Sequence, residues 1–288
     1  MTVLRGGFEA GRAHAPRATI VVPAFDEAAR LAVSLPCLAR WAVAAGAEVL
    51  VVDDGSTDGT GQVAAGILRS HRAGSVLRLA SNEGKGAAVR AGVAAARGEA
   101  IVFMDADLAT DLGDLPALLD GLLTHDVVIG SRSLRGSVVT DDAGRRRLGA
   151  GFNALVGALT GLPFGDTQCG FKAFRAGAAK QLFALGSTDG FAFDVEILLL
   201  ASRLGMRITE RPVRWHAVDG SKVNRLRDPV RMAVDVLRVS LRWAGDRPLV
   251  AAARLAASSP VRPTAPIDLT EGADIRRPAP TPASLAFT

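Results

Sequence analysis

Short apolar runs alternate with helical patterns along the first half of the chain, and this alternation limits the fold more than any other feature. The runs 18–22, 48–52, 75–79 and 100–104 are bounded by polar residues, proline or glycine, as buried strands are. Segments of helical length lie between them, beginning with residues 27–45. Strands that alternate with helices at this spacing predict βαβ units and a parallel sheet, which is an α/β fold.

Acidic residues follow two of the predicted strands. Asp53 and Asp54 come after the second strand, and Asp105 and Asp107 come directly after Met104. Open α/β sheets bind ligands beyond the carboxyl ends of their strands, and paired carboxylates there can hold Mg²⁺ or Mn²⁺ with positions left open for substrate phosphates. Two surface aspartates in a solvated turn are the alternative, because so short a motif often arises by chance.

Composition restricts the class of protein and its partners. A chain of 288 residues, 49% of them hydrophobic, can bury a full core and suggests one α/β domain with extensions. The net charge of +5 and the pI near 10.0 indicate anionic partners, namely nucleic acid, anionic lipid or phosphorylated substrates. With only Cys37 and Cys169, a disulfide framework and a Cys-rich zinc site are excluded, which suits a reducing compartment.

Four segments are predicted from local composition and pattern. They are a flexible leader at 1–17, the main domain at 18–225, a basic amphipathic helical extension at 226–257 and a disordered Pro-rich tail at 258–288. No run reaches 18 uninterrupted apolar residues, so no bilayer-spanning segment is expected.

The extension has the pattern of an amphipathic helix from about residue 229 to 243. Its two faces consist of the apolar residues Val230, Val234, Leu237 and Leu241, and of the arginines Arg227, Arg231, Arg238 and Arg242. Such a helix either lies on a membrane surface or packs on the domain with a solvated basic face, and the apolar segment 249–257 adds some weight to the membrane.

Further candidate residues lie at predicted helix starts. Lys85 is at the start of a predicted helix that extends to Ala96. At a helix N-terminus, the Lys85 side chain can contact a phosphate or lie in solvent. Asp194 and Glu196 precede the apolar helix 197–204, and carboxylates in a first helical turn are also explained by the helix dipole alone. The segment 207–215 is predicted to be an edge strand.

Seven short motifs, in this order, carry a family resemblance. They are residues 22–27 (VPAFDE), 52–58 (VDDGSTD), 82–86 (NEGKG), 105–107 (DAD), 130–132 (GSR), 166–172 (DTQCGFK) and 193–196 (FDVE). Together they resemble the inverting family-2 glycosyltransferases with a GT-A fold, and within these the dolichyl-phosphate glucosyltransferase branch. The resemblance covers residues 18–225 and implies a mixed, mostly parallel sheet flanked by helices.

The resemblance also implies roles for individual residues on the donor side. It places Pro23, Ala24, Glu27 and Asp54 around the nucleotide, and Asp105 with Asp107 on a Mg²⁺ or Mn²⁺ ion at the diphosphate. We add Asp53 and Lys85 to the donor-binding set, because they belong to the same motifs.

For the acceptor, the residues leave two cases open. A lipid monophosphate is mostly dianionic at pH 7 and needs cationic positioning, for which we select Arg132 and Lys222; further suitable cations are Arg145 to Arg147 and Arg175. A sugar hydroxyl would need a positioned base, and Asp194 or Glu196 could supply it.

We therefore predict a metal-dependent, inverting transferase that moves a hexose, glucose from UDP-glucose, onto a polyprenyl phosphate. The rivals are transfer to a hydroxyl acceptor, a GDP-mannose-dependent polyprenyl-phosphate mannosyltransferase, a nucleotidyltransferase and a lipid-binding protein. A nucleotidyltransferase is disfavoured because no glycine-rich phosphate loop with Arg or Lys follows the first strand. Two acidic strand ends disfavour a non-enzymatic lipid-binding protein.

The sequence departs from the family in three respects. We expect neither the N-terminal membrane anchor of the eukaryotic relatives nor the C-terminal spans of some polyprenyl-phosphate transferases, and Leu108 stands after Asp107 where a small residue is usual. We expect a cytoplasmic protein held peripherally on the anionic cytoplasmic face of a membrane, with no nucleic-acid partner.

Overall fold

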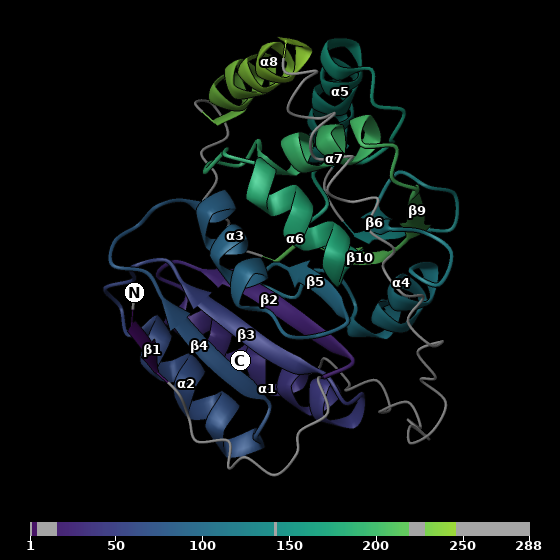
Figure 1. Ribbon diagram of the computed structural model, residues 1–288. Coiled ribbons are helices and arrows are strands. Elements are labelled where there is room, and N and C mark those ends of the chain that lie inside the picture. The colour runs from purple at the N-terminus through teal and green to yellow at the C-terminus, as the bar shows by residue number, and fades with distance from the viewer. Residues whose placement is uncertain (1, 5–15, 141–142, 219–227, 246–288) are drawn as a thin grey trace, which may run out of the picture.

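The structure is a computed structural model that describes residues 2–4, 16–140, 143–218 and 228–245 (Figure 1). Lys222, the segment 249–257 and the predicted tail 258–288 lie outside these residues.

An eight-stranded mixed sheet forms the centre of the domain, in the order β1-β4-β3-β2-β5-β8-β6-β9. Strands β4, β3, β2 and β5 run parallel, as do β6 and β9, whereas β8 is antiparallel to β5 and β6. The strands are β1 (Thr2–Leu4), β2 (Ala18–Ala24), β3 (Glu48–Asp53), β4 (Gly74–Arg78), β5 (Ala100–Met104), β6 (Val127–Ser131), β8 (Phe171–Arg175) and β9 (Ile208–Pro212), and a separate parallel pair is β7 (Val138–Thr140) with β10 (Arg214–His216). This confirms the predicted mixed, mostly parallel sheet.

Helices cover both faces of this sheet (Figure 1). The first two helices pack on one face, and α3, α6 and α7 pack on the other. The helices are α1 (Ala28–Ala44), α2 (Thr60–His71), α3 (Lys85–Ala95), α4 (Leu115–Gly121), α5 (Ala143–Thr160), α6 (Ala176–Leu185), α7 (Phe193–Arg203) and α8 (Asp228–Gly245), with one short 3₁₀ helix, η1 (Leu112–Asp114).

Alternation of side chains along β2 shows how one strand serves two cores. Ile20 and Val22 pack into the core beneath α1 and α2, whereas Val21 packs into the core with α3. Successive side chains of a strand point to opposite faces of the sheet, so a strand covered on both faces must be apolar throughout. The continuous apolar runs that predicted buried strands have this cause.

The flexible leader predicted at residues 1–17 is wrong for Thr2–Leu4. These residues form β1, which pairs antiparallel with β4. Without β1, the backbone N–H and C=O groups along one side of β4 would form an unpaired sheet edge, and an added strand satisfies them.

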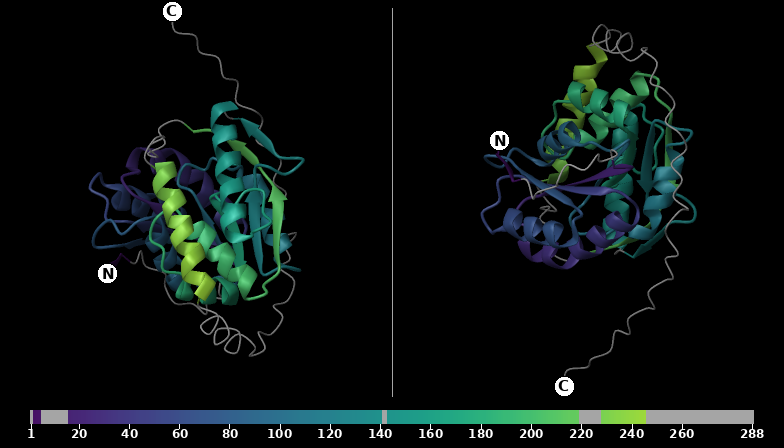
Figure 2. Two further views of the ribbon diagram at one scale, coloured as in Figure 1. Left: turned by 90° about the horizontal axis from the view of Figure 1, so that it is seen from above. Right: turned by 60° about the horizontal axis from the view of Figure 1, so that its bottom comes forward.

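Helix α8 lies beside α5 and α7 (Figures 1 and 2). Its buried face consists of Val236, Val239 and Trp243. Three of the four apolar residues grouped as one face in the sequence are outside: Val234, Leu237 and Leu241 are 42%, 43% and 66% exposed. The predicted helix is thus present, and it packs through a different face from its predicted apolar one.

Candidate active site

The carboxyl ends of the central strands bring the first motifs together. Ala24 at the end of β2 is paired in register with Asp53 at the end of β3, and Asp105 follows β5 on the other side of β2. Two adjoining cavities open at this edge. The larger, of about 460 Å³, is lined by seven of the predicted residues: Pro23, Ala24, Glu27, Asp54, Lys85, Asp105 and Asp107. We call it the donor cavity.

The turn after β3 organises one wall of the donor cavity. Asp54, which is buried, accepts hydrogen bonds from the backbone N–H groups of Glu83 and Gly84 at 2.8 and 2.9 Å. Burial raises the pKa of the Asp54 carboxyl, although those two bonds oppose the change. Asp54 therefore fixes the segment that leads into α3 and Lys85.

Asp53 has a different role from its neighbour. It is fully buried and lines neither cavity. Its Oδ1 accepts the backbone N–H of Ser56 at 2.9 Å, and its Oδ2 lies 3.2 Å from Nη1 of Arg78. Asp53 thus holds the turn and does not line the cavity, unlike the donor-binding role that the sequence predicts for it.

Residues of the same turn also bind the start of α1. The hydroxyl of Ser56 accepts the backbone N–H of Asp26, and the carboxylate of Asp58 accepts that of Ala28. The N-terminal N–H groups of a helix have no partner within the helix, so side chains from elsewhere must satisfy them. The polar residues after β3 thereby fix the loop that carries Glu27 into the donor cavity.

Asp105 and Asp107 line both cavities and form an acidic pair beside one cation. Lys85 Nζ lies 2.6 Å from Asp105 Oδ1, and Asp107 Oδ1 accepts the backbone N–H of Ala109 at 3.0 Å. Burial is the main cause that raises the pKa of Asp107, and the negative charge of Asp105 raises it further. Leu108, which follows Asp107, has a φ of 49°, a conformation that costs an L-residue about 1–2 kcal/mol. Two carboxylates that line the same cavities suit a cation.

The second cavity, of about 290 Å³, adjoins the donor cavity through Lys85, Asp105, Asp107, Phe191 and Met232. It adds a cation, Arg132, and the apolar side chains of Leu108 and Trp215. We call it the acceptor cavity.

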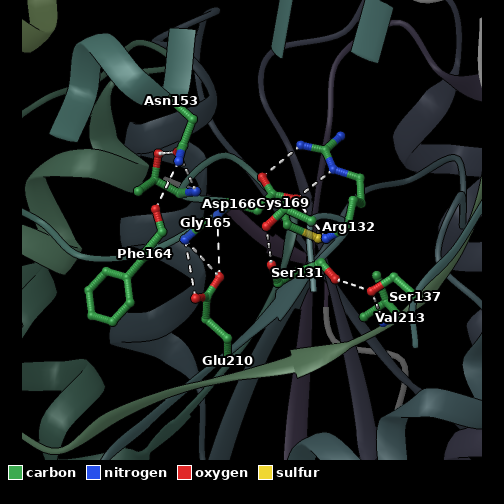
Figure 3. Close-up of polar contacts among 12 residues, drawn as sticks. Ser131, Arg132, Ser137, Asn153, Phe164, Gly165, Asp166, Cys169, Glu210 and Val213 are labelled. Atoms are coloured by element: carbon green, nitrogen blue, oxygen red, sulfur yellow. Dashed lines mark hydrogen bonds and ion pairs between the residues drawn. The ribbon is translucent and has the colours of Figure 1, made fainter. Parts of the chain in front are cut away.

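Arg132 is bound on one edge by Asp166 (Figure 3). Its Nε–H and an Nη2–H are donated to the Asp166 carboxylate at 2.7 and 2.9 Å, and its guanidinium carbon lies 5.4 Å from the centre of the Trp215 ring. Although burial opposes it, the Arg132 guanidinium holds the pKa of Asp166 below its ordinary value. Asp166 therefore stays ionised as the partner of Arg132.

Asp194 and Glu196, the two predicted bases, are two residues apart in the first turn of α7 and lie in different surroundings. Asp194 lines the acceptor cavity, and its Oδ1 lies 2.6 Å from Nζ of the buried Lys172. Glu196 lines neither cavity and is 1% exposed. It accepts hydrogen bonds from the backbone N–H groups of Ser187 and Thr188 and from the Trp243 indole. Only Asp194 faces the cavity.

Arg175 and Arg147, two of the other predicted cations, do not line the acceptor cavity. Arg175 donates to the backbone carbonyls of Leu122, Leu123 and His125, so it stabilises the end of α4. Arg147 is exposed on α5. Of the predicted acceptor-side cations that the described residues include, Arg132 alone lines the cavity.

Several lining residues were not assigned a role from the sequence. Phe191 and Met232 contribute to both cavities, and Trp215 contributes to the acceptor cavity. Phe191 and Met232 come from loop and helix segments with no local signal of a site. Asp166 and Lys172 lay within a recognised motif, which was the only signal for them.

Comparison with known proteins identifies the family. The family model described as glycosyl transferase family 2 matches residues 19–183. The chain belongs to glycosyl transferase family 2.

Similarity extends beyond the matched residues. A dolichyl-phosphate beta-glucosyltransferase of Drosophila melanogaster is 37% identical over 243 residues, covering 78% of this chain and 74% of its own. The enzyme of that name from Saccharomyces cerevisiae is 33% identical over 254 residues with the same coverage. This family-2 glycosyltransferase also shares its fold with glucosyl-3-phosphoglycerate synthase of Mycobacterium tuberculosis, with a TM-score of 0.57, 23% identity and coverage of 80% and 79%.

Proposed function

We propose that this family-2 glycosyltransferase moves glucose from UDP-glucose onto a polyprenyl phosphate. The observation that carries the proposal is the acceptor cavity, in which Arg132 lies beside the apolar side chains of Trp215 and Phe191 and next to the acidic pair. A lipid phosphate combines an anionic head with an apolar chain, and this lining suits both parts. Two relatives named dolichyl-phosphate beta-glucosyltransferase support the same substrate class.

The donor site fits a divalent cation, Mg²⁺ or Mn²⁺, on Asp105 and Asp107. The described residues include no group of three or more His, Cys, Asp or Glu side chains that could enclose a metal. Two hard oxygen ligands with open positions suit an ion that also binds the phosphates of a substrate. The structure of glucosyl-3-phosphoglycerate synthase, which shares the fold, was solved with Mn²⁺ and uridine diphosphate. The cation would supply Lewis-acid stabilisation of charge on the departing nucleoside diphosphate.

A phosphate acceptor agrees with the surroundings of Asp194. The acceptor oxygen attacks the anomeric carbon opposite the departing diphosphate, so one C–O bond forms as the other breaks and the configuration inverts. A dianionic phosphate needs no base for this step, whereas a hydroxyl does. Burial raises the pKa of Asp194 although the charge of Lys172 opposes the change, but Asp194 Oδ1 is already occupied by the Lys172 ammonium at 2.6 Å and is not free to accept a proton from a hydroxyl. Arg132 and Lys85 instead provide N–H groups that orient anionic oxygens.

The experiment that tests the reaction is incubation of the purified chain with polyprenyl phosphate and a panel of labelled nucleotide sugars. We expect label from UDP-glucose to enter the organic phase, and none without divalent cation. Label from GDP-mannose would favour the mannosyltransferase alternative. Transfer to a free sugar hydroxyl, with none to the lipid, would refute the proposal.

We further propose that the outer face of α8 contacts an anionic membrane surface. Val234, Leu237 and Leu241 are exposed there, Arg238 lies on the same helix, and Leu148 of the neighbouring α5 is 54% exposed. None of the described helices is long and apolar enough to cross a bilayer. Each basic residue near an anionic surface adds about 1 kcal/mol of attraction, which salt weakens. The cytoplasmic face expected from the sequence remains a prediction.

Sedimentation with liposomes tests this surface. We expect the chain to bind vesicles that contain an anionic lipid, and to bind them less tightly as salt is raised. Leu237→Ser with Leu241→Ser should weaken binding, and Val33→Ser, at a 78% exposed position on α1, is the control. Equal binding to neutral and anionic vesicles, or none to either, would refute the anionic contact.

A further inference from the structure

Arg132 presents only part of its guanidinium group to the acceptor cavity, because Asp166 occupies one edge (Figure 3). A guanidinium carries five N–H groups in one plane. The Nε–H and an Nη2–H are bound to Asp166, and Asp166 Oδ2 also accepts the backbone N–H of Arg132 at 3.0 Å. The remaining N–H groups lie on the edge away from Asp166.

Two contacts together fix the orientation of this group. Asp166 binds the edge of the guanidinium, and the Trp215 ring lies 5.4 Å from its central carbon. A carboxylate on one edge and an aromatic ring nearby limit rotation about the last bonds of a long, flexible side chain.

The loop that carries Asp166 is itself bound from two sides. Glu210 of β9 accepts the backbone N–H groups of Gly165 and Asp166 at 3.1 and 3.3 Å. On the other side, Asn153 of α5 donates to the carbonyl of Phe164 at 2.8 Å and accepts the backbone N–H of Thr167 at 3.0 Å. Figure 3 shows Asn153 and Glu210 reaching the loop from different elements.

The charge of the pair has a consequence for the acceptor. Arg132 and Asp166 are +1 and −1, so together they add no net charge to the cavity. If Arg132 attracted an anion by charge alone, Asp166 would oppose binding. If Arg132 binds by directed N–H groups, Asp166 assists binding because it aims them. The two accounts predict opposite effects of removing the Asp166 charge.

We propose that Asp166 is a positioning residue that aims the remaining N–H groups of Arg132 at the phosphate of the acceptor, and that Glu210 and Asn153 hold its loop in place. This inference rests on the proposed function, because a lipid phosphate is the anion that the acceptor cavity would receive. It assigns Asp166, the first residue of the DTQCGFK motif, to acceptor orientation.

The test compares Asp166→Asn with the wild-type chain. The amide keeps the size of the side chain, but it turns an NH₂ group toward the guanidinium and adds one positive charge to the cavity. We expect the KM for the lipid phosphate to rise about 10- to 100-fold, the loss of roughly one charge-assisted hydrogen bond, while the KM for the nucleotide sugar stays within about twofold. Asp120→Asn, at an exposed position on α4, is the matched control.

Two further variants act through the loop alone. Asn153→Asp keeps an acceptor for the Thr167 N–H and loses the donor to the Phe164 carbonyl, and Glu210→Gln weakens the bonds to the loop backbone. Both should raise the acceptor KM in the same direction as Asp166→Asn, but less. They keep the inference testable if Asp166→Asn fails to fold.

A binding measurement separates orientation from general damage to the fold. Because Arg132 lies beside the Trp215 ring, a short-chain, water-soluble polyprenyl phosphate should change the indole fluorescence of the wild type. Trp215→Phe serves as the blank for the two other tryptophans. We expect Asp166→Asn to need a higher concentration for the same change, and the neutral polyprenol to give a small change in both proteins.

The outcomes distinguish this inference from the proposed function. A wild-type chain that transfers sugar to no polyprenyl phosphate contradicts both. A wild-type chain that is active, with an Asp166→Asn variant whose acceptor KM is unchanged or lower, overturns the positioning role alone and favours attraction by net charge.

Discussion

Replacing Glu196 with glutamine tests whether this carboxylate is a base or a structural tie. Its Oε2 accepts the backbone N–H groups of Ser187 and Thr188 at 2.9 and 2.7 Å, and its Oε1 accepts the Trp243 indole N–H at 2.9 Å. Glutamine has one acceptor oxygen and an NH₂ group, so at least one of these donors would face another donor. The change therefore weakens the tie between α7, the preceding loop and α8.

The size of the effect follows from these three bonds. An unsatisfied buried N–H costs about 1–3 kcal/mol, and the other bonds lose their charge assistance, worth about 1 kcal/mol more. We expect Glu196→Gln to lower the free energy of unfolding by about 2–4 kcal/mol. For a domain of this size, about 2–4 °C is lost per kcal/mol, so Tm should fall by about 4–16 °C.

The assay combines thermal unfolding with initial rates measured well below both midpoints. We expect kcat within about threefold of the wild type, because Glu196 lines neither cavity. Trp243→Phe removes only the indole donor and should give part of the Tm loss, whereas Glu99→Gln at an exposed position should give none. A general base contributes about 10²–10⁴-fold, so a loss of that size in kcat with an unchanged Tm would refute the structural role.

Three further predictions concern the acidic pair and the thiols. A Cβ at Gly170 would overlap the Asp105 carboxylate, so Gly170→Ala should weaken the binding of Mn²⁺, measured by calorimetry, while Tm falls by only a few degrees. An unchanged affinity for Mn²⁺ would argue against Asp105 as a ligand. Asp107→Asn should abolish most cation-dependent transfer with Tm nearly unchanged; a large loss of Tm would indicate a structural role instead. Burial raises the pKa of Cys169 to about 12, so its reactive thiolate forms only near that pH. Iodoacetamide at pH 8 should therefore modify only the exposed Cys37 in the folded chain, which mass spectrometry would detect.

The sequence by itself determined the parallel centre of the sheet and the acidic ends of its strands. Local signals suffice for this, because a strand buried on both faces must be continuously apolar and must end where the chain becomes polar. Asp54, Asp105 and Asp107 could be placed at one edge for that reason, before any contact was known. Family motifs similarly marked Arg132 and Asp194, which the structure places in the acceptor cavity.

Only the tertiary structure decided what each polar residue faces. Asp53 and Asp54 are neighbours in sequence, yet one holds a turn and the other lines the donor cavity. Asp194 and Glu196 are separated by a single residue, yet one faces the acceptor cavity and the other is tied to α8. Spacing along the chain fixes which side chains lie near a strand or helix end, but direction depends on partners far away in sequence.

The same reason explains α8. The sequence showed an apolar stripe and a basic stripe, and it left open whether the helix lies on a membrane surface or packs on the domain with its basic face in solvent. In the structure, Val236, Val239 and Trp243 pack inward instead, and the Trp243 indole donates to the buried Glu196 carboxylate, 47 residues away. A buried carboxylate needs hydrogen-bond donors, and the tertiary fold decides which donors lie near it. The periodicity of apolar residues along a helix contains no information about the position of those donors.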